Sequence, residues 1–417
     1  MRYDFTAYGG KCSCGRSHDM VTRAAVIEPG CLKDFEQIMR DYGIGGKRCA
    51  LYGENGWRAT SDRHPRAEQE IVLNPENLHA NEVSTAEVLA RLEEDVEVII
   101  AVGSGTIHDI ARFCAHERGI RFVSCVTGAS VDGFCSTVAA MTWYGFKKTL
   151  PAVAPEIVIA DIDIIKKAPK ELVRSGVGDI AAKYTALCDW QISTAVTGEY
   201  FCGRIHDLMA EATDTVMKSI PAIVAEEDEG YHNITDALLL SGIAMQMIGN
   251  SRPASGCEHH ISHLIEMGPE QLEVRFPAMH GEKTGVASVY AIREYKRLAQ
   301  TEDIRPFLSD YRAFPEEELK RFLGERLSPA ILKENEQDCL AKVEKEALAA
   351  AWPRIRELIA GLPDPEELDG LLVQLGAKHR LEEIGVSEGD LDTLLRYSPM
   401  VRNRLTLMRM RRMITLP

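Results

Sequence analysis

In about the first 165 residues, short apolar runs alternate with helical patterns, and this alternation narrows the choice of fold more than any other feature. The runs are bounded by Gly, Pro or charged residues, as buried parallel strands tend to be. They cover 24–27, 48–52, 70–73, 96–102 and 121–126. Helical patterns lie between them, as at 32–42 and 84–92. The alternation predicts a doubly wound α/β domain.

Beyond about residue 166 the pattern becomes helical. Apolar residues recur at spacings of three and four, as in 234–248 and 285–298, and the final part is charged and helical, with turns such as 361–365. Before this change, the runs 146–150 and 156–159 predict a hairpin across 151–155. We therefore predict a Rossmann-like α/β domain over residues 1–165 and an all-α domain over residues 166–417.

Composition and charge exclude several classes of function. A net charge of -15 argues against a nucleic-acid partner, because binding the phosphate backbone needs a basic surface. No apolar run reaches the length of about 18 residues that a membrane span needs, and no apolar signal segment opens the chain. Most of the 11 cysteines sit in apolar stretches, which fits buried thiols in a reducing cytoplasm. Examples are Cys49, Cys114, Cys125, Cys188 and Cys202.

A glycine-bearing turn follows the run 96–102. Gly103 and Gly105 let the backbone approach a pyrophosphate, and the helix that begins near Thr106 offers N–H groups and the positive end of its dipole. Glu54 follows the run 48–52, where an acid can accept hydrogen bonds from a ribose hydroxyl and favour NAD. Arg58 could instead meet the 2′-phosphate of NADP. The alternatives are that the turn at Gly103 and Gly105 binds no ligand and that Glu54 is a solvent-exposed acid in a loop.

A second polar run follows the run 121–126. It offers hydroxyls and a carboxylate where ligands bind in open α/β sheets, and an Asp-Gly turn is the alternative. Its residues of interest are Thr127, Gly128, Ala129, Ser130 and Asp132, with Ser136 as a further donor.

Asp179, His259 and His280 are candidate ligands for one divalent metal ion. We expect Asp179 at the mouth of a helix after glycines, and His280 at the start of another helix. One carboxylate and two imidazoles suit zinc or a similar ion and leave a coordination position open for a substrate oxygen. His263 lies one helical turn after His259, on the same face. A chance grouping of polar residues is the alternative.

The N-terminal stretch also contains metal-ligand residue types. Cys12, Cys14 and His18 stand close together, but a second cysteine pair is missing from this spacing. The sequence therefore favours a flexible arm here.

Several segments together resemble a known family. In chain order they are VGSGTIHDIARF, TGASVDGFCSTVAA, GFKKTLPAVAPEIVIADIDII, GVGDIAAKYTALCDW, RPASGCEHHISHLIE and HGEKTGVAS. The chain resembles the sn-glycerol-1-phosphate dehydrogenases of the iron-containing alcohol dehydrogenase and dehydroquinate synthase-like superfamily. The C-terminal segment YSPMVRNRLTLM is similar to the bacterial branch. The sequence departs from the family pattern at Val126, Gly128 and Glu54, which leaves the choice between NADH and NADPH open.

The resemblance implies a role for each matching residue. Asp179, His259 and His280 would hold the metal, which would be zinc, nickel or iron. Asp132 and His263 would contact the substrate, and Asp179 would join metal and substrate. The implied cofactor contacts are Gly105, Thr106, Ile107, His108, Asp109, Thr127, Ser130 and Ser136.

The implied activity is metal-assisted, NAD(P)H-dependent reduction of dihydroxyacetone phosphate to sn-glycerol 1-phosphate by a cytoplasmic homodimer. A proton would reach the product through His263 or water, because imidazole titrates near neutrality. The candidate cations for the substrate phosphate are Lys147, Lys148, Arg252 and Lys283, and no spacing decides among them. The alternatives are a glycerol or polyol dehydrogenase, a dehydroquinate synthase-like lyase, and a non-catalytic binding protein.

Overall fold

The computed structural model describes residues 1–76 and 78–416, and for Phe146 and Lys147 it describes the backbone. The chain divides into two compact units. Unit 1 comprises Met1–Val177 and Asp214–Asn250, and unit 2 comprises Gly178–Thr213 and Ser251–Pro417. The domain boundary between residues 165 and 166 stays a prediction. Helices α6 (Lys170–Ala181) and α8 (Gly203–Lys218) contain residues of both units.

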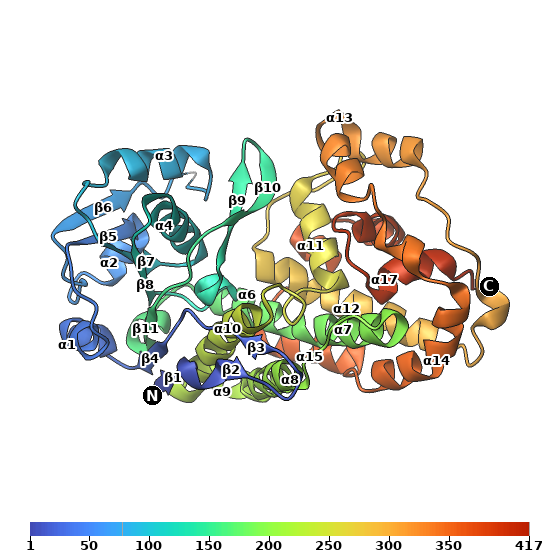
Figure 1. Cartoon of the computed structure of the whole chain (residues 1–417), viewed down its shortest axis with the longest axis horizontal. Coiled ribbons are helices and arrows are strands. Elements are labelled where there is room, and N and C mark those ends of the chain that lie inside the picture. Colours follow the sequence, from blue (N-terminus) through green and yellow to red (C-terminus); the bar gives the residue numbers. More distant parts are fainter. Residues whose placement is uncertain (77, 417) are drawn as a thin grey trace. The chain divides into compact units, whose positions relative to one another are not determined.

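Among the described residues, unit 1 contains a seven-stranded sheet (Figure 1). β1 runs antiparallel to β4, and the other neighbouring strands are parallel. The five strands predicted from the apolar runs are confirmed, with small shifts at their ends. In spatial order the strands are β1 (Arg2–Asp4), β4 (Ala24–Glu28), β11 (Ile157–Asp161), β8 (Arg121–Val126), β7 (Val98–Gly103), β5 (Arg48–Gly53) and β6 (Gln69–Leu73).

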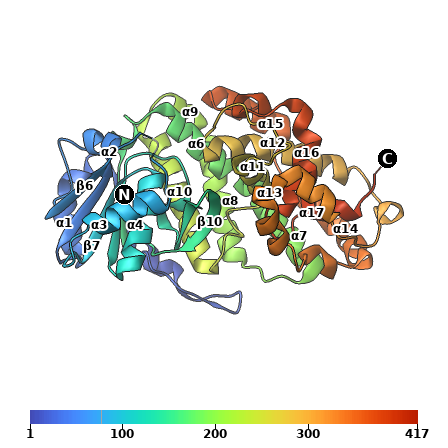
Figure 2. The same cartoon turned by 90° about the horizontal axis from the view of Figure 1, so that it is seen from above.

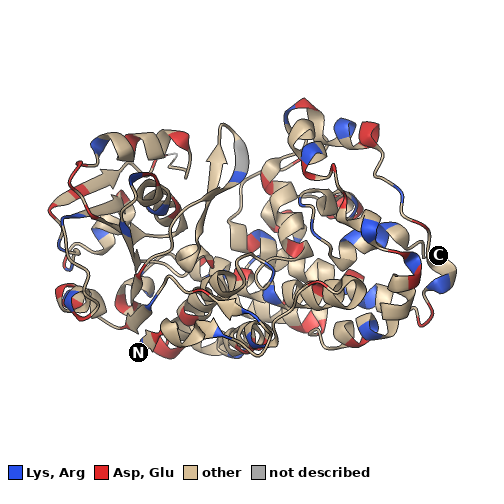
Figure 3. Ribbon diagram, in the orientation of Figure 1, with Lys and Arg blue, Asp and Glu red and all other residues tan. Residues whose placement is uncertain are grey.

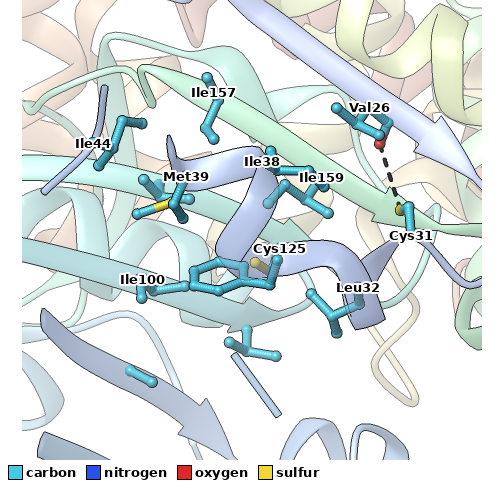
Figure 4. Packing of buried hydrophobic residues seen from close by; sticks show 14 of the residues in the cluster. Val26, Cys31, Leu32, Ile38, Met39, Ile44, Ile100, Cys125, Ile157 and Ile159 are labelled. Atoms are coloured by element: carbon cyan, nitrogen blue, oxygen red, sulfur yellow. Dashed lines mark hydrogen bonds between the residues drawn. The ribbon is translucent and has the colours of Figure 1, made fainter. Parts of the chain in front are cut away.

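Both faces of this sheet are buried. In β7, Val98 and Ile100 lie in one apolar cluster and Ile99 in another, because side chains alternate along a strand. Helix α1 (Phe35–Asp41) covers the first face, where Ile38 and Met39 pack beside Ile100 (Figure 4). Helices α3 (Glu82–Arg91) and α4 (Gly105–Arg118) cover the second. Burial on both sides explains why these strands are apolar throughout.

The predicted hairpin between 146–150 and 156–159 was wrong. β10 (Phe146–Pro151) pairs instead with β9 (Val138–Trp143), across a turn in which Tyr144 and Gly145 have positive φ. β11 lies between β4 and β8 in the parallel sheet, and all its residues are buried. A strand without a polar face gains more from a central position in a sheet than from a two-stranded ribbon.

The order of the strands creates a topological switch point at β5. The chain passes from β5 to its neighbour β6 on one side, and β7 then lies on the other side of β5. In open α/β sheets, ligands bind at the carboxyl ends of the strands where the order reverses in this way. The ends of β5 and β7 are therefore the expected place for a dinucleotide.

Unit 1 also contains several short elements, among them the 3-10 turns η1 (Phe5–Tyr8) and η2 (Cys31–Asp34), and the long helix α10 (Asp228–Ile248). The other short elements are β2 (Gly10–Lys11), β3 (Ser17–His18), α2 (Glu54–Ala59), the 3-10 turn η3 (Gly133–Cys135), α5 (Ile162–Ile165) and α9 (Ile220–Val224).

Unit 2 is helical, as the sequence predicted (Figures 1 and 2). Helix α11 packs along α12, and α7 packs on α14. Lys and Arg are interspersed with Asp and Glu along these helices (Figure 3). None of the helices in the described part of the chain has the length and apolar character of a membrane span. The main helices are α7 (Lys183–Thr197), α11 (Cys257–Met267), α12 (His280–Ala299), α13 (Glu316–Glu334), α14 (Lys345–Ala360), α15 (Pro365–Leu375), α16 (Leu391–Tyr397) and α17 (Leu407–Met410).

Candidate active site

Asp179 lies within helix α6, near its C-terminal end, and the predicted turn before a helix was wrong. The neighbouring residues Gly176 and Gly178 lie inside the helix, where they allow close packing. A Cβ atom on Gly178 would come within 2.2 Å of the carbonyl oxygen of Gly281 at the start of α12. A Cβ atom on Gly176 would come within 2.3 Å of the carbonyl oxygen of Ala129. The glycines therefore let the backbone of α6 approach its neighbours closely.

Unit 2 brings the three predicted metal ligands together. Asp179, His259 and His280 each offer a ligand atom, and these atoms all lie within 4.8 Å of one another. Nε2 of His259 lies 3.6 Å from Oδ1 of Asp179. Two such ligands at about 2.0–2.1 Å from one tetrahedral ion would be about 3.4 Å apart. The distance between His259 and Asp179 is thus close to the separation that one first-row ion sets, and His280 offers its ligand atom within 4.8 Å of both.

Two carboxylates orient the histidines of this trio. Oε1 of Glu258 lies 2.7 Å from Nδ1 of His259, and Oε1 of Glu266 lies 2.9 Å from Nδ1 of His280. A proton on each Nδ1 that is donated to the carboxylate leaves Nε2 as the lone-pair atom. Carboxylates behind ligating histidines commonly fix the tautomer and increase the basicity of the ligand. Glu258 and Glu266 were not singled out from the sequence.

The charges around the trio are strongly coupled. Burial would lower the pKa of His280, but the carboxylates of Glu266 and Asp179 outweigh it and raise this pKa. Burial would raise the pKa of Glu266, but His280 and Lys283 hold it well below its usual range. Burial raises the pKa of Glu258. A carboxylate and two histidines in this polar surrounding fit a divalent ion with an open coordination position, and zinc, nickel and iron all suit the set.

Lys183 is a further residue that the sequence did not reveal. It is fully buried, and its Nζ lies 3.1 Å from Oδ1 of Asp179 and donates to the carbonyl oxygen of Ala254. A buried ammonium group needs such partners. Lys183 therefore helps to hold the carboxylate of Asp179 in place.

His263 lies beside the trio, as the helical spacing predicted. Its ring is stacked on that of His280, with centroids 5.6 Å apart. Burial lowers the pKa of His263 despite Glu266, and the positive charges of Arg402, His280 and His259 lower it further. Its role toward the substrate stays a prediction.

Asp132 belongs to unit 1. Its Oδ2 accepts a hydrogen bond of 2.8 Å from Oγ of Ser241 on α10, and it lies at the N-terminal end of η3. Its predicted substrate contact is not tested by this geometry.

The glycine turn lies at the switch point of the sheet. β7 ends at Gly103, and α4 begins at Gly105. A Cβ atom on Gly103 would come within 2.9 Å of the side chain of Ile107, so Gly is required for this tight packing. The first N–H groups of a helix have no acceptor within it, which makes the start of α4 a ready anion site.

Glu54 begins helix α2 at the end of β5, beside this turn. It forms an i,i+4 ion pair with Arg58, and both side chains are exposed to solvent. Glu54, which would favour NAD, and Arg58, which would favour NADP, therefore lie together. The geometry favours neither cofactor.

The polar run after β8 packs against the same strand end. The N–H group of Thr127 donates to the carbonyl oxygen of Gly103 at 3.0 Å. Oγ of Ser175 donates to the carbonyl oxygen of Ser130. A Cβ atom on Gly128 would come within 2.8 Å of the side chain of Leu172, which explains the glycine there. The side chains of this run are buried except at residues 131–133.

Arg112, another residue that the sequence did not reveal, holds the end of this run. It is fully buried on α4 and donates to the carbonyl oxygens of Phe134 and Ser136, both at 2.9 Å. Its signal was an arginine between the apolar residues Ala111 and Phe113 of an amphipathic helix. Asp109 lies 3.7 Å from Arg112.

His108 is buried with both ring nitrogens engaged. Nδ1 lies 2.9 Å from the carbonyl oxygen of Ser104, and Nε2 lies 2.7 Å from Oγ of Ser124. Burial lowers the pKa of His108 to about 3, so the ring is neutral. The imidazole therefore stabilises the start of α4, and its predicted cofactor contact remains a prediction.

Two candidate cations for a substrate phosphate have protein partners. Arg252 donates to Glu199 and to the carbonyl oxygen of Leu405. Lys283 donates to the carbonyl oxygen of Ala278 and pairs with Glu266. Lys148 is exposed on β10, and the side chain of Lys147 lies outside the described residues.

Comparisons with known proteins agree with this architecture. Residues 26–169 match the family model described as iron-containing alcohol dehydrogenase. A solved iron-containing alcohol dehydrogenase from Corynebacterium glutamicum superposes with a TM-score of 0.62 at 18% identity, covering 95% of this chain and 96% of that chain. A sulfoacetaldehyde reductase from Bifidobacterium kashiwanohense, solved with NAD+, gives 0.57 at 14% identity, with 91% of each chain covered. The fold is thus that of the iron-containing alcohol dehydrogenases.

Curated relatives define the family more narrowly. The glycerol-1-phosphate dehydrogenase [NAD(P)+] of Geobacillus stearothermophilus is 36% identical over 330 residues, which are 79% of this chain and 75% of that protein. The enzyme of the same name from Bacillus subtilis (strain 168) is 34% identical, over 81% of this chain and 76% of that protein. The chain belongs to the glycerol-1-phosphate dehydrogenase family.

Proposed function

We propose that this protein catalyses the reversible, NAD(P)H-dependent reduction of dihydroxyacetone phosphate to sn-glycerol 1-phosphate. The observation that carries the proposal is the trio Asp179, His259 and His280, whose two histidines are oriented by buried carboxylates. The relatives that share the family bear the name of this activity. A glycerol or polyol dehydrogenase and a dehydroquinate synthase-like lyase are not favoured by these relatives.

In this mechanism the chain holds a metal and a nicotinamide. A divalent ion bound by the trio would supply Lewis acidity toward the substrate carbonyl, and the reduced nicotinamide would supply the hydride. Glu258 and Glu266 keep Nε2 of His259 and His280 available as ligand atoms. His263, whose ring is stacked on that of His280 and whose lowered pKa keeps it neutral, would relay a proton from water to the product oxygen.

The remaining residue roles belong to the same proposal. Asp132 would hold a substrate hydroxyl, and Asp179 would contact both metal and substrate. The helix start at Gly105 would bind the cofactor pyrophosphate, because it lies at the switch point of the sheet. The further cofactor contacts proposed are Glu54, Gly103, Thr106, Ile107, His108, Asp109, Thr127, Gly128, Ala129, Ser130 and Ser136.

A group of arginines in unit 2 supports a phosphorylated substrate. Burial lowers the pKa of Arg402, whose charge in turn lowers the pKa of His263. Burial, together with Arg252 and Arg402, lowers the pKa of Arg404 to about 9. Both side chains are partly buried, and Arg404 donates to the carbonyl oxygens of Ser251 and Ser255. Arg402, whose charge acts on His263 beside the trio, is therefore the cation that we propose for the substrate phosphate.

The test is an NADH-oxidation assay with dihydroxyacetone phosphate and with dihydroxyacetone, across zinc, nickel and iron, with the stereochemistry of the product determined. We expect turnover of the phosphorylated substrate alone, with net consumption of NADH. Equal turnover of both substrates would identify a polyol dehydrogenase. The variant Arg402→Ala should raise KM for the phosphorylated substrate, whereas Arg354→Ala, on the exposed face of α14, should leave it unchanged.

The assembly and location of the protein are also part of the proposal. A homodimer follows from the resemblance to the family, and light scattering at working concentration would check it. A cytoplasmic location fits the many buried cysteine side chains, because thiols persist in reducing compartments.

A further inference from the structure

The cysteines and histidine of the N-terminal segment lie in an ordered hairpin. β2 pairs with β3 in antiparallel register, with Gly10 opposite His18. The N–H group of Cys12 donates to the carbonyl oxygen of Arg16 at 2.9 Å. The N–H group of Gly15 donates to the carbonyl oxygen of Cys12 at 3.1 Å. Gly15 has a φ of 86°, which closes this turn. The flexible arm favoured by the sequence is therefore a folded loop.

This loop gathers three ligand atoms. The thiols of Cys12 and Cys14 and a ring nitrogen of His18 all lie within 4.8 Å of one another. Sγ of Cys14 lies 3.5 Å from Nε2 of His18. Sulfur at about 2.3 Å and nitrogen at about 2.0 Å from one tetrahedral zinc ion would be separated by about 3.5 Å. The observed distance is thus the separation that a shared zinc ion sets.

The histidine is oriented as a metal ligand. His18 is only 2% exposed, and its Nδ1 lies 2.6 Å from the carbonyl oxygen of Met247 on α10. A proton on Nδ1 satisfies that carbonyl and leaves the lone pair on Nε2, the atom that faces Cys14. Cys12 and Cys14 are partly exposed, which gives an ion a path of entry.

We propose that Cys12, Cys14 and His18 bind a zinc ion that ties the N-terminal hairpin to α10. Two thiolates and one imidazole are soft and borderline ligands that select zinc over magnesium or calcium. The fourth position is filled by water or by another group of the chain. This site is structural and independent of the reaction, because none of its ligands belongs to the trio Asp179, His259 and His280.

Cobalt substitution tests the site directly. Metal-stripped full-length protein is titrated with Co²⁺, and the thiolate-to-cobalt charge-transfer band in the near ultraviolet is recorded. Asp179, His259 and His280 contain no sulfur, so His259→Ala should keep the band. We expect a weaker band in Cys14→Ser and no band in the double variant Cys12→Ser/Cys14→Ser. Cys339→Ser, which removes a partly exposed thiol elsewhere, is the matched control and should keep it.

Zinc content and thiol reactivity give independent readouts. The double variant should lose one equivalent of zinc per chain, and His259→Ala should lose the other. In the wild type, alkylation of Cys12 and Cys14 should be slow with zinc and fast after chelation, a comparison that needs no variant to fold. A cobalt band that survives in the double variant, or alkylation at equal rates with and without zinc, would overturn the proposal.

Discussion

At the scale of single residues, the candidate metal site depends on groups that are not ligands themselves. Glu258 and Glu266 each face the Nδ1 atom of a histidine, and Lys183 lies against Asp179. Each of them is at least largely buried, where an electrostatic contact is stronger than in water. The ligand geometry is therefore set before any ion arrives.

Replacing one of these carboxylates should weaken metal binding without removing a ligand. In Glu266→Gln the amide oxygen can still accept the hydrogen bond from Nδ1 of His280, but the negative charge is lost. We expect metal affinity to fall by about 10- to 100-fold, measured by competition with a chelator. Glu273→Gln, at an exposed position, is the control. Unchanged affinity in Glu266→Gln would show that the negative charge of Glu266 does not contribute to metal binding.

A buried acid elsewhere should make stability depend on pH. Burial raises the pKa of Asp236 on α10 to about 7, against a hydrogen bond from Tyr3 that lowers it. In the unfolded chain this acid ionises near 3.8. The folded state thus holds its proton longer, and stability falls as pH rises from about 4 to about 7, by ~1.4 kcal/mol for each unit of pKa difference.

The variant Asp236→Asn removes this dependence. We expect it to be more stable than the wild type at pH 8, with a smaller difference at pH 5, by urea unfolding at both values. Asp392→Asn, on the exposed side of α16, should show no such trend. An Asn variant that loses the same stability at both pH values would mean that Asp236 is ionised in the fold.

At the scale of elements, the apolar runs predicted the strands of the sheet, but they did not predict how β10 pairs or how α6 packs on α12. The runs that became β5, β7 and β8 were identified because strands buried on both faces are apolar throughout. The pairing of β10 with β9 was not predicted, because the pairing of two strands depends on contacts that the sequence of one strand does not encode. A turn was predicted before Asp179, inside what is helix α6, because glycine is a poor helix former. Gly178 is needed there because α12 packs closely against it.

The same limit applied to the candidate site. His259 was singled out because it shares a helical face with His263, and His280 because it opens a helix before a glycine, and the family resemblance then gave both a ligand role. Glu258 and Glu266 stood in the same segment, but a glutamate on a helix is usually solvated. The packing of α11 on α12 brings Glu266 against His280, whereas Glu258 faces His259 within α11 itself.

Gly178 offers a test of the close approach of α6 and α12. In Gly178→Ala the added methyl group would meet the carbonyl oxygen of Gly281, so one backbone must shift. We expect a loss of about 1–3 kcal/mol in the free energy of unfolding. Gly370→Ala is the matched control, because this glycine lies inside α15 with open space around its Cβ position, and we expect it to gain up to about 1 kcal/mol. Equal stability of the two variants would contradict the packing argument.

At the scale of the whole molecule, the two compact units carry different parts of the proposed chemistry. The glycine turn at Gly103–Gly105 belongs to unit 1, and the trio Asp179, His259 and His280 belongs to unit 2. Neither unit is continuous in sequence, because 214–250 groups with the sheet. Sequence patterns report local structure, so they detect the change from alternating strands and helices to helices alone near residue 166. They do not detect that the later segment 214–250 packs in unit 1.

This division predicts that metal binding and cofactor binding can be lost separately. His259→Ala removes a metal ligand from unit 2, so we expect metal retention and turnover to be lost while NADH binding, measured by fluorescence titration, stays nearly intact. Gly105→Val adds a side chain where a Cβ atom would already come within 2.9 Å of Val131, so we expect NADH binding to be lost. Its metal content should remain that of the wild type, since the affected helix start lies in unit 1. If either variant lost both ligands while still unfolding cooperatively, the assignment of metal and cofactor to separate units would be wrong, because each variant alters side chains of one unit alone.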